Sequence, residues 1–83
     1  MDLFRKVNAL LTKTFPPPDE VDLRDEDGIV GMVVSKRFRR METIDRQTMI
    51  WTLLGRNLDP KEQRKILAIV AVTPEEQIGH ASV

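Results

Sequence analysis

The residues best suited to chemistry form a basic cluster near the middle of the chain. Four cations fall within five positions, and we call this segment the basic turn: Lys36, Arg37, Arg39 and Arg40. Like charges this close repel one another, and an anionic partner would relieve that repulsion. The basic turn therefore predicts a contact surface for a phosphate-bearing or acidic partner, to which Arg46 would add. The alternative is a solvated face without a function, anchored in the core by Phe38.

Groupings typical of catalytic or metal sites are not evident. The chain has no cysteine and one histidine, His80, which lies in a tail that we expect to fray. A metal site or a nucleophilic dyad needs several such groups close together. The adjacent carboxylates fall at a turn, Asp25–Asp27, or at a helix start, Glu75–Glu76, where acidic residues are common for local reasons. We therefore expect no enzyme, no metal site and no cofactor.

Size and composition limit the architecture. Eighty-three residues indicate a single domain spanning residues 1–83. A chain this short buries about 60–65% of its unfolded surface, which predicts one layer of helices on one sheet and no enclosed substrate pocket. The absence of cysteine favours a cytoplasmic location. The longest apolar run, Ile66–Val72, has seven residues and is too short to span a membrane.

The charges are segregated although the net charge is zero. Residues 1–30 hold seven acidic and four basic side chains, a net charge of −3, whereas residues 31–65 hold four acidic and nine basic ones, a net charge of +5. Residues 66–83 add two glutamates. A dedicated nucleic-acid-binding protein is usually basic overall. The distribution favours a local contact with an anionic partner.

The first half of the chain predicts a helix followed by a hairpin. Apolar residues at helical spacing follow the capping residue Asp2, and three prolines from Pro16 onward end that helix. The alternating segment Glu20–Glu26 predicts an edge strand, and the two-residue turn Asp27-Gly28 joins it to an apolar central strand, Ile29–Val34. We expect Gly31 to allow the close approach of a helix.

The second half predicts helices and one further strand. Ser35 opens a short helical turn through Phe38, and Thr43 caps the main helix, with Gly55 as its C-cap. Asp59, Pro60 and Glu62 then begin a short helix with a capping box. The β-branched run Ile66–Val72 predicts a buried strand, and the segment Thr73–Glu76 begins a last helical turn.

The element order predicts a known topology. The order is α-β-β-α-α-β with a final short helix, an α+β arrangement with a mixed three-stranded sheet covered by helices on one face. This is the topology of the type II KH fold, whose members grip nucleotides with a Gly-x-x-Gly loop. The corresponding segment here, Arg39–Glu42, has no glycine. Single-strand binding in the manner of a KH domain is therefore weakly supported.

Two motifs resemble those of the BolA-like family. The segment Ser35-Lys36-Arg37-Phe38, with Arg46-Gln47 and then Ile50, Leu53 and Leu54, resembles the pattern S-x-x-F-x-G…R-H-x-x-V-x-x-x-L. The segment Leu67-Ala68-Ile69…Thr73-Pro74-Glu75-Glu76 resembles H-A-L-x-I…T-P-E-E. The resemblance covers about Ile29 to Glu76. It implies the BolA-like fold and a small regulatory or adaptor protein.

Three departures from the family pattern bear on function. The family glycine after the phenylalanine is Arg40, the histidine after the arginine is Gln47, and the histidine opening the last strand is Lys65. In the family this last histidine helps to bind an iron–sulfur cluster shared with a monothiol glutaredoxin. A protonated lysine cannot replace it as a ligand, and the short Asp27-Gly28 turn replaces the loop that usually supplies a second ligand.

The sequence thus predicts a BolA-like adaptor or regulatory protein that binds a protein partner or nucleic acid and does not ligate a cluster. The expected contact residues are Lys36, Arg37, Arg39, Arg40, Arg46 and Lys65, and all of them except Lys36 are expected to form a continuous positive surface. One alternative is a structural interaction module, monomeric or weakly dimeric through the strand Val21–Asp25 or through Trp51. A second alternative is an iron–sulfur protein that partners a monothiol glutaredoxin.

Overall fold

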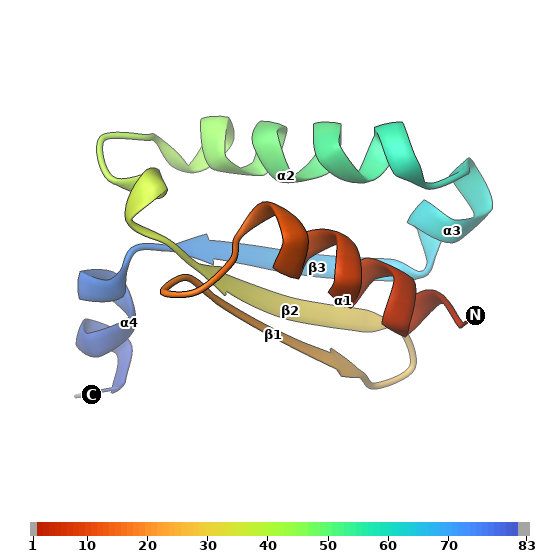
Figure 1. Cartoon of the computed structure of the whole chain (residues 1–83), viewed down its shortest axis with the longest axis horizontal. Helices are drawn as coiled ribbons and strands as arrows, with labels where there is room; N and C mark the ends of the chain where they lie inside the picture. The colour runs from red at the N-terminus through yellow and green to blue at the C-terminus, as the bar shows by residue number, and fades with distance from the viewer. Residues whose placement is uncertain (1, 82–83) are drawn as a thin grey trace.

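The computed structural model describes residues 2–81, and the side chains of residues 2–77. Helix α1 is followed by a hairpin, two further helices, a third strand and a last helix, with a short 3-10 helix η1 before α2 (Figure 1). The elements are α1 (Leu3–Thr14), β1 (Glu20–Asp25), β2 (Ile29–Val34), η1 (Lys36–Phe38), α2 (Thr43–Asn57), α3 (Pro60–Arg64), β3 (Ile66–Val72) and α4 (Pro74–Ala81).

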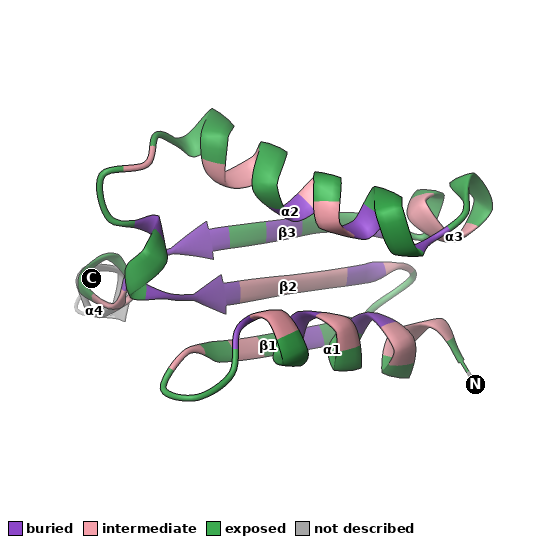
Figure 2. Cartoon of the chain, turned by 45° about the horizontal axis from the view of Figure 1, so that its top comes forward, coloured by how far each residue is buried: buried purple, intermediate pink, exposed green. Residues whose placement is uncertain are grey.

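The three strands form one mixed sheet in the order β1-β2-β3. Strands β1 and β2 are antiparallel, and β3 runs parallel to β2 after the crossover through α2 and α3. Helices α1 and α2 lie over the same face of the sheet (Figures 1 and 2). The α+β fold class, the mixed sheet and its one-sided helical cover are therefore confirmed.

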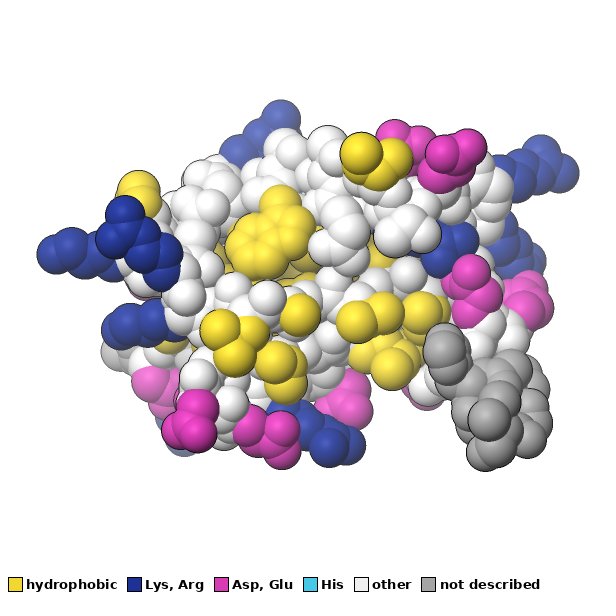
Figure 3. Space-filling model, turned by 180° about the vertical axis from the view of Figure 1, so that it is seen from behind, with side chains coloured by type: hydrophobic (Ala, Val, Ile, Leu, Met, Phe, Trp, Pro, Cys, Tyr) yellow, Lys and Arg dark blue, Asp and Glu magenta, His cyan; other side chains and the backbone are white. Residues whose placement is uncertain are grey.

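The core lies between that face and the two long helices. Val7 and Leu11 of α1, and Ile50 and Leu54 of α2, are fully buried at helical spacing. They pack on inward-facing strand residues, among them Leu23, Val33 and Ile69. On the side opposite α1, hydrophobic side chains gather in the middle of the surface and charged ones toward its edges (Figure 3). Val70 on β3 keeps 49% of its surface exposed.

Local capping signals fix most element boundaries. Asp2 caps α1 by accepting a 2.9 Å hydrogen bond from the Arg5 amide, and Asp59 and Glu62 form the predicted capping box of α3. Thr73 and Glu76 form the equivalent pair at the start of α4. This last helix extends to Ala81, beyond the single turn expected from the sequence. The His80 side chain lies outside the described residues.

The main helix begins and ends differently from the prediction. Its N-cap is Glu42, without a side-chain hydrogen bond, so Thr43 is the first helical residue and not the cap. Gly55 is not the C-cap, because α2 continues to Asn57 and the Leu58 amide donates to the Leu54 carbonyl. Leu58 is buried. Burial of Leu54 and Leu58 four residues apart extends the helix past the glycine.

The hairpin also differs in detail. Strand β1 ends at Asp25, so three residues and not two connect the strands, although Asp27 and Gly28 have the expected positive φ angles of 56° and 137°. Gly31 does not make room for a helix. A Cβ atom there would lie 2.2 Å from a methyl carbon of Leu23, its partner on β1. The glycine instead lets Leu23 fold across β2 into the core.

Within the described part of the chain, no helix has both the length and the apolar character needed to cross a membrane.

Candidate binding surfaces at the two ends of the sheet

The basic turn lies at the end of the sheet where β2 and β3 finish, beside α4; we call this the basic-turn end (Figure 1). Ser35 caps η1 by accepting a 3.0 Å hydrogen bond from the Arg37 amide, and its hydroxyl donates to Asp19. Phe38 is fully buried, with its ring 5.5 Å from that of Phe15. Phe38 therefore anchors the turn, as the sequence predicts.

Arg37 contacts the C-terminal end of α1. Its guanidinium lies 4.2 Å above the Phe15 ring and donates a hydrogen bond to the backbone carbonyl of Thr14 at the end of α1. The carbonyls of the last helical turn have no partners within the helix and attract cations. Arg37 thus caps the C-terminus of α1 with one of its five N–H donors.

Arg46 is the most enclosed cation of the set, with 11% of its side chain exposed. Its Nε donates to the Met41 carbonyl at 3.0 Å, and its Nη1 donates to the Ala71 carbonyl at 3.2 Å. The same Nη1 lies 2.6 Å from a carboxylate oxygen of Glu76. Arg46 therefore ties α2 to the end of β3 and to α4, which is a structural role.

Helix α4 brings two carboxylates to the basic turn. Glu75 pairs with Arg39 and Glu76 pairs with Arg46. The pKa of Glu75 lies below its ordinary value because backbone donors and Arg39 stabilise the anion, and the pKa of Glu76 is lowered first by the Thr73 amide and then by Arg46. The sequence explained these acids as local capping residues only. Their pairing with the basic turn depends on the tertiary fold.

Lys36 and Arg40 remain available. Both are exposed, and neither forms an ion pair or side-chain hydrogen bond with another residue whose side chain is described. Arg40 has a φ angle of 66°, in the left-handed region. A residue with a Cβ atom pays about 1 kcal/mol to adopt this conformation, whereas glycine adopts it freely.

Lys65 lies at the opposite end of the sheet. It immediately precedes β3, whereas the basic turn follows the far end of the parallel strand β2. The seven residues of β3 separate the two sites, and a strand of that length spans roughly 20 Å. The structure therefore gathers five of the six predicted cations and separates Lys65 from them. The prediction of a continuous positive surface that includes Lys65 is therefore wrong.

The end that contains Lys65 has a hollow that the sequence did not indicate. We call it the hairpin end, because the β1–β2 connection, the start of α1 and the α3–β3 junction meet there (Figure 1). The hollow has a volume of about 870 Å³ and is open to solvent. Its apolar lining includes Phe4, Ile29 and Leu67. No local motif predicts it, because its walls come from three separate segments of the chain.

Comparison with solved structures agrees with this fold. The arrangement of helices on a mixed three-stranded sheet is a type II KH-like fold. The structure is similar to BolA1 from Arabidopsis thaliana, with a TM-score of 0.70 and 26% sequence identity over 92% of this chain and 96% of that chain. The chain has the BolA-like fold, which agrees with the resemblance to that family in the sequence. No protein-family model matches the sequence, and no curated protein matches it either.

The residues at the hairpin end do not fit an iron–sulfur cluster or a metal ion. Lys65, at the position of the family histidine, presents an ammonium group that cannot act as a ligand. The connection between β1 and β2 is a three-residue turn without cysteine or histidine. Among the described residues, no three acidic, cysteine or histidine side chains are grouped so that they could hold a metal ion.

The second departure, Gln47, has a structural explanation. Its side-chain amide donates a 2.8 Å hydrogen bond to the Ile69 carbonyl and accepts one from the indole of Trp51 at 3.2 Å. Strand β3 is an edge strand, and Gln47 and Arg46 together occupy two of its carbonyl groups. The side chains of α2 thus cover an edge that could otherwise pair with another chain.

Proposed function

We propose that this BolA-like protein is a non-enzymatic adaptor that binds an acidic protein surface through the basic turn. The observation that carries the proposal is the conformation of Arg40. This residue stands where the family has glycine, and it holds a positive φ angle that glycine would adopt without cost. Residues retained in strained conformations are concentrated at functional sites. The strained residue is an exposed cation in the same turn as exposed Lys36.

The number of available cations favours a protein over a nucleic acid. Lys36 and Arg40 are unpaired among the described side chains, and Arg39 is exposed but paired with Glu75. Proteins that bind DNA tightly often make about 6–10 phosphate contacts. A short acidic segment needs fewer cations. A monothiol glutaredoxin, suggested by the family resemblance, would be held here by charge and not by a shared cluster, in a reducing compartment such as the cytoplasm.

The experiment compares two anionic probes of equal length and charge. A fluorescent ten-residue polyglutamate peptide and a single-stranded DNA oligonucleotide are titrated with the protein at two salt concentrations. The test variant is Lys36→Gln with Arg40→Gln. The matched control is Arg56→Gln with Lys61→Gln, which removes two other exposed cations.

We expect the peptide to bind, and the test variant to weaken that binding about tenfold while the control variant leaves it unchanged. Equal losses in the two double variants would mean that only the overall charge matters and would overturn the proposal. Tighter binding of the DNA, with a steep salt dependence, would instead favour the nucleic-acid function.

A further inference from the structure

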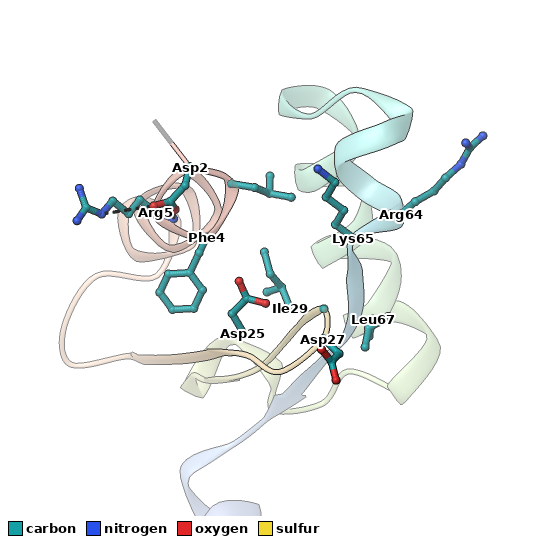
Figure 4. Close-up of a pocket in the computed structure, with 11 residues that line it drawn as sticks. Asp2, Phe4, Arg5, Asp25, Asp27, Ile29, Arg64, Lys65 and Leu67 are labelled. Atoms are coloured by element: carbon teal, nitrogen blue, oxygen red, sulfur yellow. Dashed lines mark hydrogen bonds and ion pairs between the residues drawn. The ribbon is translucent and has the colours of Figure 1, made fainter.

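The hollow at the hairpin end contains two opposite charges that do not neutralise each other. Figure 4 shows the Asp25 carboxylate and the Lys65 ammonium group turned toward the space between α1 and β3. Neither group forms an ion pair with the other, or with any residue whose side chain is described. By contrast, the side chains of Arg5, Arg64 and Asp27 extend away from the hollow (Figure 4).

Apolar groups line the rest of the hollow. Phe4 and Leu3 come from α1, Ile29 begins β2, and Leu67 on β3 keeps 58% of its surface exposed. Sites for small molecules are commonly hollows of about 300–1,000 Å³ with apolar walls and a few polar groups that set orientation. The hairpin-end hollow has that composition, and its volume falls within that range.

The charges limit the class of ligand. A phosphate or another simple anion would be attracted by Lys65 but repelled by Asp25. A simple cation would be attracted by Asp25 but repelled by Lys65. A purely apolar molecule would leave both groups without partners. A molecule with an ammonium group, a carboxylate and an apolar body would satisfy all three parts of the lining. We infer that this hollow binds a zwitterion of the class of the hydrophobic amino acids, with its ammonium group at Asp25 and its carboxylate at Lys65.

This inference is independent of the proposed function, because it concerns the opposite end of the sheet. It also gives a reason for the lysine that replaces the family histidine: an ammonium group at this position can pair with a carboxylate, whereas it cannot ligate a cluster. Both charged groups are exposed, so the affinity should be weak, with a dissociation constant of about 1 mM.

The test uses three probes that share one aromatic body. L-Phenylalanine carries both charges, 3-phenylpropanoate lacks the ammonium group, and 2-phenylethylamine lacks the carboxylate. Each probe is titrated into the isotope-labelled full chain, and amide NMR shifts are followed at Gly28, Ile29 and Lys65, which line the hollow. We expect L-phenylalanine to bind at least about fivefold more tightly than either of the other probes.

Two variants test which charged group of the ligand each residue binds. Asp25→Asn should weaken the binding of L-phenylalanine and 2-phenylethylamine but strengthen that of 3-phenylpropanoate, because it removes a repulsive charge. Lys65→Gln should weaken the binding of the two carboxylates but not that of the amine. Both variants should fold, because neither side chain has a hydrogen bond or ion pair within the described part of the chain. Arg64→Gln is the control, since Arg64 borders the hollow but extends away from it (Figure 4).

The inference is overturned if none of the three amides shifts up to about 10 mM L-phenylalanine, or if the three probes bind equally well. It is also overturned if Arg64→Gln has the same effect as the two test variants. The variant Lys36→Gln with Arg40→Gln should bind L-phenylalanine as the parent protein does. Failure at this hollow therefore leaves the proposed function at the basic turn untouched.

Discussion

At the basic-turn end, Arg37, Arg39 and Arg46 each contact a carbonyl or carboxylate of the same chain, and Arg46 is almost fully enclosed. At the hairpin end, Asp25 and Lys65 face an open hollow and have no partner among the described side chains. Two of the four cations of the basic turn, and the neighbouring Arg46, thus have partners within the fold. Two charged side chains without a described partner remain at each end: Lys36 and Arg40 at the basic-turn end, and Asp25 and Lys65 at the hairpin end.

This difference shows why a run of cations is a weak sign of a binding surface. Burial and hydrogen bonding decide whether an arginine serves the fold or a partner, and both depend on segments distant in the sequence. The predictions below test that division of roles, beginning with the largest expected effect.

Replacing Arg46 should cost the most stability. Arg46→Met keeps an unbranched apolar stem but removes the guanidinium, with its hydrogen bonds to Met41 and Ala71 and its pair with Glu76. Because two carbonyl groups then lose their donors, we expect the free energy of unfolding, measured by urea denaturation, to fall by about 2–3 kcal/mol. The exposed Arg56→Met, also on α2, should change stability by less than about 0.5 kcal/mol. Equal effects would mean that the contacts of Arg46 contribute nothing.

Replacing Arg40 with glycine should have the opposite effect on stability. Glycine adopts the positive φ angle of 66° without a steric cost, so Arg40→Gly should stabilise the protein by about 1 kcal/mol. The same change should weaken binding of the polyglutamate peptide. Thermal unfolding and peptide titration measure the two effects together. A destabilised variant would show that the arginine side chain supports the fold, contrary to the proposed function.

Low pH should destabilise the protein by protonating Glu76 of α4, which pairs with Arg46 at the basic-turn end. The pKa of Glu76 is held below its ordinary value of 4.5, first by the Thr73 amide and then by Arg46. A group with a lowered pKa in the folded state stabilises the protein above its ordinary pKa, and this contribution is lost as the pH falls through the lowered value. Stability should therefore fall below pH 4.5, and Glu76→Gln should flatten that decline. Parallel pH profiles for parent and variant would contradict this.

Much of the fold could be predicted because its signals are local. The run Ile66–Val72 forms β3 with the predicted bounds, and Asp59 with Glu62 forms the predicted capping box. Gly55 misled the prediction because burial of Leu54 and Leu58 outweighs the tendency of glycine to end a helix.

The sites were harder to predict because they join distant segments. The pairing of Arg46 with Glu76 spans thirty positions, and nothing in either local motif requires it. Asp25 was read as part of a turn and Lys65 as part of the basic surface. Only the pairing of the strands, which places Asp25 beside Ile29 and Ile29 beside Ile66, brings them to one hollow, and the start of α1 adds its remaining wall.

The most direct test of this division of roles is the NMR spectrum of the arginine side-chain Nε–H groups in the parent protein. The Nε–H of Arg46 donates to the Met41 carbonyl, so its signal should be well dispersed and exchange slowly with water. That of Arg40 should exchange as fast as in an unfolded peptide, and only it should shift when polyglutamate is added. Equally fast exchange at Arg46 and Arg40, or a peptide-induced shift at Arg46 alone, would contradict the account.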